Sequence, residues 1–176
     1  PEALLVVGSK GRVLSLDVAL NRGSHPYLGG HTVEGEVVVP VVLVLEWFSR
    51  MARAFRPDLR LESIDQLKVL QGILLRDFEG AGERFSLTCH QQSNGQGALL
   101  ALGLTGADGT PRYRALAQMV EHRSAAPEAQ PAAPALSLSD WGGAPIYGDV
   151  LFHTDQFQVI RDLDGVGDDG ISGTLA

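Results

Sequence analysis

The chain has 176 residues, of which 44% are hydrophobic and 20% are charged, and its formal net charge is −7. This length is enough for one ordinary domain, or for one small domain and part of another. The negative charge disfavours a general nucleic-acid-binding protein, because such proteins need basic surface to displace the counterions of phosphates.

The sequence predicts neither a membrane span nor a disulfide framework. The longest apolar run, residues 37–45, is shorter than the roughly 20 residues that a membrane-spanning helix needs. We find no signal segment at the start of the sequence, and Cys89 is its single cysteine. We therefore expect a cytoplasmic protein in which Cys89 is a buried apolar residue rather than a nucleophile.

Two short apolar segments near the N-terminus predict a β-hairpin. Residues 4–7 and 13–20 are separated by the glycine-bearing segment 8–11, which is typical of two antiparallel strands and their turn. The composition of residues 21–26 predicts a loop after this hairpin.

Residues 41–55 predict the main helix. Pro40 marks its start, because proline lacks an N–H and is tolerated in a first helical turn. Residues 41–48 contain Glu46 as their single charged side chain, so we expect a helix that is buried nearly all round. The apolar stripe is formed by Leu43, Val44, Trp47, Phe48, Met51 and Phe55.

Long strands are predicted after this helix. Residues 59–75 suggest a strand that is interrupted near residues 71–72. One helix followed by long antiparallel strands is an α+β pattern, in which a curved sheet wraps around the helix. Residues 84–92 alternate with a clear period of two and predict a strand. Further strands are expected at 98–105 and at 112–121, which alternates less cleanly, with turns at 93–97 and 106–111.

The composition divides the chain into a first unit of residues 1–122, a linker of residues 123–140 and a second unit of residues 141–176. The linker is rich in alanine and proline, which favours an extended segment without a core. Within the second unit, residues 164–170 predict a hairpin turn rather than a calcium loop, because the twelve-residue ligand order with a terminal glutamate is missing.

His31, Gly35 and Pro40 form a histidine-x3-glycine-x4-proline pattern before the main helix. This pattern resembles the first-half motif of dehydratase domains from polyketide synthases and polyunsaturated fatty acid synthases. A later stretch resembles the start of the second half of the same family, although residues 154–155 differ from the family's usual glycine and small residue. The matching positions there are Tyr147, Leu151, Phe152, His153, Phe157 and Gln158.

The resemblance implies a double hotdog fold, in which two antiparallel sheets each wrap around a long central helix. This chain would hold the first hotdog and a second one that is begun but incomplete. The family's second helix, with its catalytic aspartate, is then expected beyond Ala176.

Dehydration of a β-hydroxyacyl thioester needs a base, an acid and donors for the thioester oxygen. The resemblance assigns His31 as the general base, a role that suits the ordinary pKa of histidine of about 6.5. Backbone N–H groups near a helix N-terminus suit the stabilisation of the oxygen. The predicted substrate-binding residues are Gly35, Val39, Pro40, Tyr147 and Phe152.

Two of these assignments have structural alternatives. Gly35 is equally well explained as a turn glycine. Glu46 resembles the second catalytic group of single-hotdog acyl-carrier-protein dehydratases, but it also stands four residues before Arg50, where the two side chains can form an ion pair. The predicted acid is therefore an aspartate outside this sequence, or Glu46 as the weaker candidate.

The resemblance implies no dissociable cofactor, because the substrate arrives on the phosphopantetheine of acyl carrier protein. The expected partners are acyl carrier protein, other synthase domains and a second copy of the chain in a homodimer, with no nucleic acid and no membrane. A metal site is not expected, because His25, His31 and His153 lie in separate loops without ligand spacing. A basic patch for the acidic carrier is predicted at Arg50, Arg53, Arg56 and Arg60.

Three functional hypotheses follow. The first is a dehydratase domain that converts a β-hydroxyacyl thioester into an α,β-enoyl thioester, with carbon–oxygen lyase activity. The second is a non-catalytic pseudo-dehydratase that shapes a synthase or mediates dimerisation. The third is a double-bond isomerase or a cyclase on the same fold, which would use the same histidine.

Overall fold

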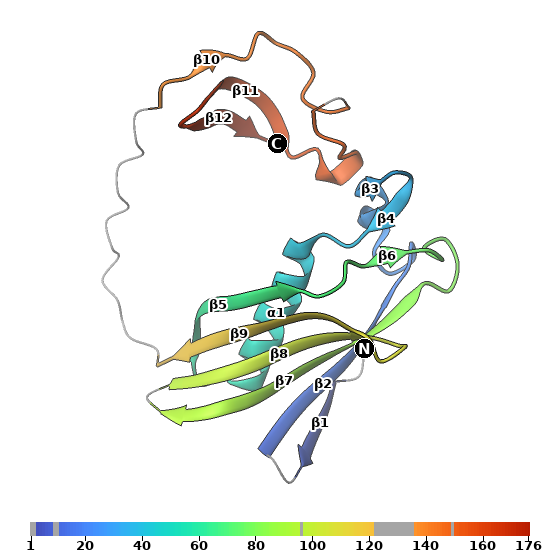
Figure 1. Cartoon of the computed structure of the whole chain (residues 1–176), viewed down its shortest axis with the longest axis vertical. Coiled ribbons are helices and arrows are strands. Elements are labelled where there is room, and N and C mark those ends of the chain that lie inside the picture. The colour runs from blue at the N-terminus through green and yellow to red at the C-terminus, as the bar shows by residue number, and fades with distance from the viewer. Residues whose placement is uncertain (1–2, 9–10, 96, 122–135, 149) are drawn as a thin grey trace.

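The computed structural model describes residues 3–8, 11–95, 97–121, 136–148 and 150–176 (Figure 1). Most of the predicted linker therefore lies outside the described residues. The elements in chain order are β1 (Ala3–Gly8), β2 (Gly11–Leu20), the 3₁₀ helix η1 (Pro26–Gly30), β3 (Thr32–Val33), β4 (Glu36–Val38), α1 (Val41–Phe55), β5 (Arg60–Val69), β6 (Leu74–Leu75), β7 (Glu83–Gly95), β8 (Gly97–Gly106), β9 (Pro111–Val120), β10 (Ser139–Asp140), the 3₁₀ helix η2 (Asp155–Phe157), β11 (Ile160–Gly167) and β12 (Gly170–Leu175).

The main sheet contains six antiparallel strands in the order β1-β2-β7-β8-β9-β5, and it curves around α1 (Figure 1). The predicted N-terminal hairpin is confirmed, with Leu5 paired to Leu14. The predicted α+β hotdog architecture, one helix against a curved antiparallel sheet, is confirmed as well.

Alternation with period two creates the face of the sheet that packs on the helix. Every second residue of β8 from Ala98 to Leu104 is buried, and the intervening residues are half-buried. In β7 the buried positions are Phe85, Leu87 and Cys89. Because successive side chains of a strand point to opposite faces, these residues form one continuous apolar surface.

The predicted turn at residues 93–97 is wrong in length. The ladder between β7 and β8 continues to the pair Gly95–Gly97, so Ser93, Asn94, Gly95 and Gly97 belong to strands rather than to a turn. The polar composition of this stretch favoured a longer loop, but pairing with the neighbouring strand extends β7 beyond what local composition indicates.

The helix α1 is buried on one side, so the prediction of burial nearly all round is wrong for the part of the chain that is described. Val41 and Val42 at its start are 38% and 63% exposed. The sheet covers a single stripe with helical spacing, and the opposite side of the helix faces outward. The buried members of this stripe are Val44, Phe48, Met51, Ala52 and Phe55.

Two small sheets accompany the main sheet in the described residues, one in the order β3-β4-β6 and one, in the C-terminal part of the chain, in the order β10-β11-β12 (Figure 1). The predicted hairpin at 164–170 is confirmed, because β11 and β12 pair up to Gly167 and Gly170. Strand β10 falls at the end of the predicted linker and pairs with β11. Among the helices of the described residues, none is long and apolar enough to cross a bilayer.

Replacement of Phe48 by alanine tests the packing of α1 on the sheet. Phe48 is completely buried, so Phe48→Ala should lower the free energy of unfolding by about 3–5 kcal/mol. Val42→Ala on the exposed side of the same helix is the matched control and should change it by about 0.5 kcal/mol or less. Chemical denaturation followed by circular dichroism measures both, and equal losses would contradict one-sided burial.

Cys89 should be chemically inert in the folded protein. Its side chain is fully buried, and this burial raises the pKa of the Cys89 thiol to about 12. At pH 8 the thiol is therefore protonated, and the nucleophilic thiolate is nearly absent. A thiol reagent should label Cys89 rapidly only after denaturation, and fast labelling of the native protein would contradict this placement.

Candidate active site

A tight hairpin between β3 and β4 explains the spacing of the histidine-x3-glycine pattern. Val33 pairs with Glu36, which leaves Glu34 and Gly35 as a two-residue loop with φ values of 53° and 83°. A type I′ turn needs positive φ at both positions, so Gly35 acts as a turn glycine here. The hairpin brings His31 opposite the end of β4.

Two hydrogen bonds to Val38 hold His31 in place. The Val38 N–H donates to the His31 carbonyl at 3.0 Å, and the Val38 carbonyl lies 2.8 Å from Nδ1 of the His31 ring. Because a carbonyl oxygen can only accept, Nδ1 must carry the hydrogen of this bond. In the neutral ring the lone pair then lies on Nε2, which is the nitrogen that can act as a base.

Aromatic side chains from the C-terminal part of the chain surround the half-buried His31 ring. The ring centroids of Phe152, His153 and Phe157 lie 5.3, 5.2 and 5.2 Å from that of His31. The segment that carries them is attached to the end of η1, where the Thr154 N–H donates to the Gly30 carbonyl at 2.9 Å. The first and second parts of the chain therefore meet at this histidine.

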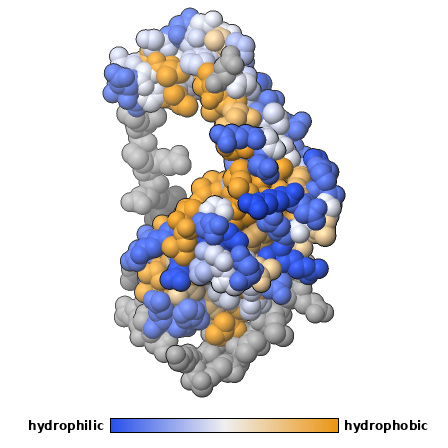
Figure 2. Space-filling view, turned by 45° about the vertical axis from the view of Figure 1, so that its right-hand side comes forward, coloured by the Kyte–Doolittle hydropathy of each residue, from blue (hydrophilic) through white to orange (hydrophobic). Residues whose placement is uncertain are grey.

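A mostly apolar groove of about 300 Å³ lies beside the start of α1. Phe157 lines this groove, and its ring centroid lies 5.2 Å from that of His31, whereas His31 itself does not line the groove. Figure 2 shows apolar surface gathered in the middle of the molecule, below the part that holds β10–β12. The groove is lined by Tyr27, Pro40, Val42, Leu43, Glu46, Gln156 and Phe157.

Some of the backbone amides around the start of α1 already donate hydrogen bonds within the protein. The Val39 N–H donates to the Ile73 carbonyl at 3.0 Å, and the Val39 side chain is only 2% exposed. Pro40 is the N-cap and supplies no capping side-chain bond. The first-turn amides of Val41 and Val42 have no acceptor within the helix, and the partial positive charge of the helix start lies there.

Glu46 lines the groove but is paired with Arg50. The Arg50 Nε donates to Glu46 Oε1 at 2.6 Å, and the side chain of Glu46 is 50% exposed. The i, i+4 ion pair that the spacing predicts is thus present on the helix surface.

Tyr147 and Phe152 lie in different environments. The Tyr147 hydroxyl accepts a hydrogen bond from the Ile160 N–H at 2.7 Å, and its side chain lines a separate cavity in the β10–β11 part. Phe152 stands beside His31 and stacks on His153 with a centroid separation of 4.2 Å. The structure therefore places Phe152, but not Tyr147, at the candidate base.

The predicted basic patch is largely compensated by carboxylates. Arg56 pairs with Asp58 at 2.6 Å, and Arg60 pairs with Glu62 at 3.5 Å. Arg50 has its partner on its own helix, as described above. The positive charge of three of the four arginines is therefore paired with a carboxylate.

His25 lies apart from the other two loop histidines. Its ring contacts those of Tyr27 and Trp47 at centroid distances of 5.9 and 6.3 Å, and burial lowers the pKa of His25. Within the described ranges, no three histidine, cysteine or acidic side chains are grouped so that they could hold a metal ion.

The sequence did not identify two residues that contact the candidate base. His153 and Phe157 were part of the second family-like stretch, but neither was assigned to the site. The signal was present in that stretch itself, since both residues match the second-half pattern of the resembled family. Their contact with His31 depends on tertiary structure, which periodicity does not reveal.

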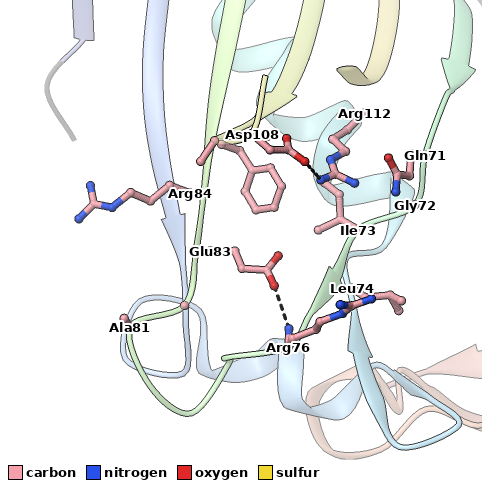
Figure 3. Close-up of a pocket in the computed structure, with 14 residues that line it drawn as sticks. Gln71, Gly72, Ile73, Leu74, Arg76, Ala81, Glu83, Arg84, Asp108 and Arg112 are labelled. Carbon is pink, nitrogen blue, oxygen red and sulfur yellow. Dashed lines mark hydrogen bonds and ion pairs between the residues drawn. The ribbon is translucent and has the colours of Figure 1, made fainter. Parts of the chain in front are cut away.

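A larger cavity, of about 670 Å³, lies elsewhere, between the β6–β7 connection and the β8–β9 turn (Figure 3). Its walls carry charges of both signs: Arg112 pairs with Asp108 at 3.1 Å, and Glu83 accepts a hydrogen bond from the Arg76 N–H at 2.9 Å. None of the predicted site residues lines this cavity. The smaller groove therefore remains the candidate site, because chemistry-bearing residues meet beside it.

Sequence comparisons find no matching protein-family model and no matching curated protein. Solved structures do match. The dehydratase domain of a mycocerosic acid synthase-like polyketide synthase aligns with a TM-score of 0.56 and 13% identity, over 80% of this chain and 42% of that domain. The dehydratase domain from the CurF module of curacin polyketide synthase aligns with a TM-score of 0.55 and 12% identity, over 70% of this chain and 44% of that domain.

An (R)-hydratase from A. caviae involved in PHA biosynthesis also matches, with a TM-score of 0.48 and 12% identity, over 65% of this chain and 98% of that one. The chain spans less than half the length of the two dehydratase domains. At these identities the similarity to the two dehydratase domains shows the hotdog fold, which the family resemblance of the sequence implied, and fold alone does not select a reaction.

Replacement of Gly30 by alanine should loosen the segment that covers His31. A Cβ at Gly30 would collide with the carbonyl oxygen of Thr154, whereas one at Gly29 would meet only the flexible end of Arg22, at 3.2 Å. Hydrogen exchange of the Thr154 amide should therefore accelerate in Gly30→Ala and remain slow in the control Gly29→Ala. Equal exchange in both variants would show that this contact does not depend on the glycine.

Proposed function

We propose that this chain contributes the base-bearing hotdog of a dehydratase that removes water from a β-hydroxyacyl thioester. One observation carries this proposal: Val38 fixes the His31 ring so that Nε2 is the free nitrogen. A base held beside an apolar groove and a helix start is the arrangement that proton abstraction next to a thioester requires.

We assign the steps of the reaction to the following groups. Nε2 of His31 takes the proton from the α carbon, and the groove beside Phe157 holds the acyl chain. The thioester oxygen gains negative charge as this proton leaves. The first-turn amides of Val41 and Val42 are suited to donate to that oxygen, because they have no acceptor within the helix.

Acyl carrier protein is the proposed source of the substrate, bound through its phosphopantetheine thioester. The dehydratase domains that share the fold come from polyketide synthases, and the resemblance found in the sequence implies a substrate carried on acyl carrier protein. No dissociable cofactor is required, because the elimination of water breaks the Cα–H and Cβ–O bonds with the help of a base and an acid and involves no net oxidation or reduction. Other synthase domains and a second copy of the chain are further proposed partners, in the cytoplasm.

A non-catalytic hotdog is the second candidate function. It is favoured by the state of Glu46, which is half-exposed and engaged with Arg50 rather than directed to His31 by any hydrogen bond. Such a domain would retain the fold and release no water from a β-hydroxyacyl thioester.

Two substitutions at His31 separate the base from the structural role of the ring. His31→Asn keeps an N–H donor for the Val38 carbonyl but removes Nε2, whereas His31→Ala removes both. Both variants should lose roughly 10²–10⁴-fold in kcat/KM, the usual contribution of a general base, and His31→Asn should keep the wild-type stability. Conversion of a β-hydroxyacyl pantetheine thioester into its enoyl product, followed by mass spectrometry, measures the effect.

His90→Ala is the matched control, because this histidine lies exposed on β7, away from the groove. It should retain the full rate of water loss. Wild-type protein that releases no more enoyl product than His31→Asn would contradict the dehydratase proposal and favour the non-catalytic hotdog.

A further inference from the structure

A row of four residues crosses the outer face of the main sheet, which is the face turned away from α1. Thr88 on β7 pairs with Gly103 on β8. Gly103 also pairs with Arg114 on β9, and Arg114 pairs with Lys68 on β5. These four strands lie side by side in the sheet (Figure 1). Because the neighbours of Gly103 and Arg114 along β8 and β9 are buried and successive side chains point to opposite faces, the row points outward.

Lys68 and Arg114 are two cations in directly opposite positions. Both residues are exposed, and within the part of the chain that the structure describes neither forms an ion pair. Asp65, three residues before Lys68 on β5, instead accepts a hydrogen bond from the Ser63 hydroxyl at 2.5 Å. Like charges directly opposite each other on neighbouring strands destabilise a sheet. The positive charge of this pair is therefore available to an anion, in contrast to that of the carboxylate-paired arginines described above.

A β-bulge in β5 brings Lys68 to this face of the sheet. Pairing advances by two positions on β9, from 116 to 114, while β5 advances by three, from 65 to 68. Without the extra residue, Lys68 would point to the opposite face, because side chains alternate along a strand. Gln66 within the bulge has a φ of 51°, an uncommon conformation for a residue other than glycine. The backbone thus departs from a regular strand at the point where the second cation joins the first.

Gly103 leaves an opening between Arg114 and Thr88. A Cβ at Gly103 would lie 2.9 Å from Oγ1 of Thr88, so this hydroxyl lies close above the glycine. Neighbouring strands are about 4.8 Å apart, so the backbones of β7 and β9 flank the opening at a separation of roughly 10 Å. The hydroxyl of Thr88 can donate one hydrogen bond, and the guanidinium of Arg114 donates from a planar fork. An anion above Gly103 therefore has donors on both sides.

A groove of about 660 Å³ contains this row and extends beyond it. Its apolar lining includes Leu116 and Leu70, the second of which is 47% exposed. Of the described residues, none lines both this groove and the groove beside α1. A ligand held at the row by its negative charge can therefore place an apolar group along the groove, away from the candidate active site.

We propose that this groove binds a small phosphate monoester with an apolar organic group. A phosphate monoester carries about 1.5–2 negative charges at pH 7, which match the two adjacent cations, whereas a carboxylate carries one. Arg114 suits two phosphate oxygens at once, and Lys68 acts as a point charge. The inference does not rest on the dehydratase function proposed above, because the groove and α1 lie on opposite faces of the sheet.

Titration of the isotope-labelled protein with phenyl phosphate, followed by NMR, tests the site. The backbone amide signals of Gly103 and Arg114 should shift in a saturable way. Inorganic phosphate should shift the same signals with lower affinity, because it lacks an apolar group. Benzoate should bind more weakly than phenyl phosphate, because it carries a single charge. Added sodium chloride should lower the affinity for phenyl phosphate, since the charges of the site are exposed and salt screens them.

Four variants locate the bound anion. Lys68→Gln and Arg114→Gln should each weaken the binding of phenyl phosphate by about tenfold, because each removes a hydrogen bond between charged groups. Gly103→Ala keeps both charges but fills the opening, so it should weaken binding as well. Arg53→Gln is the matched control, because it removes the same charge from an exposed position on α1, and it should keep the wild-type affinity.

Each result either supports this site or overturns it. Saturable shifts at the row that are lost in both charge variants would support it. The absence of saturable binding by wild-type protein, or an equal affinity in Lys68→Gln, Arg114→Gln and Arg53→Gln, would overturn it. Equal affinities for benzoate and phenyl phosphate would overturn the choice of a phosphate. Undiminished binding by Gly103→Ala, with a circular dichroism spectrum like that of wild-type protein, would overturn the placement of the anion above Gly103.

Discussion

Burial of one stripe of α1 against the curved sheet is the constraint on which the rest of the structure depends. Phe48 is a fully buried member of this stripe. Once this stripe is fixed, the start of the helix at Pro40 and the preceding strand β4 have a defined position. Val38 at the end of β4 can then hold His31, so the geometry of the candidate base follows from the core.

The strands and the helix could be predicted because their signals are local. Alternation in β7 and β8 and the apolar stripe of α1 arise from side-chain periods that the sequence displays directly. The ion pair of Glu46 and Arg50 was predictable for the same reason, since residues four apart on a helix are neighbours. Gly35 was left open between a turn and a binding role, and its backbone conformation of φ 83° places it in the turn.

Features that depend on distant segments could not be predicted in this way. Whether Val42 is exposed depends on which segments pack against the outer side of α1. The sequence of the helix itself does not say which segments these are. The contact between His31 and His153 likewise depends on how the C-terminal segment attaches to η1. Composition assigned these histidines to separate loops, which is correct along the chain but not informative about their distance in space.

The site therefore forms only when the two parts of the chain are in contact. The first part alone supplies the fixed imidazole and the helix start, whereas the rings that cover this imidazole come from the segment around Phe152 and Phe157. Apolar cover around a base excludes water and strengthens its electrostatic interactions. Because the attachment includes the backbone hydrogen bond between Thr154 and Gly30 and a closely packed glycine, a small change there should alter the environment of His31 without changing the hotdog core.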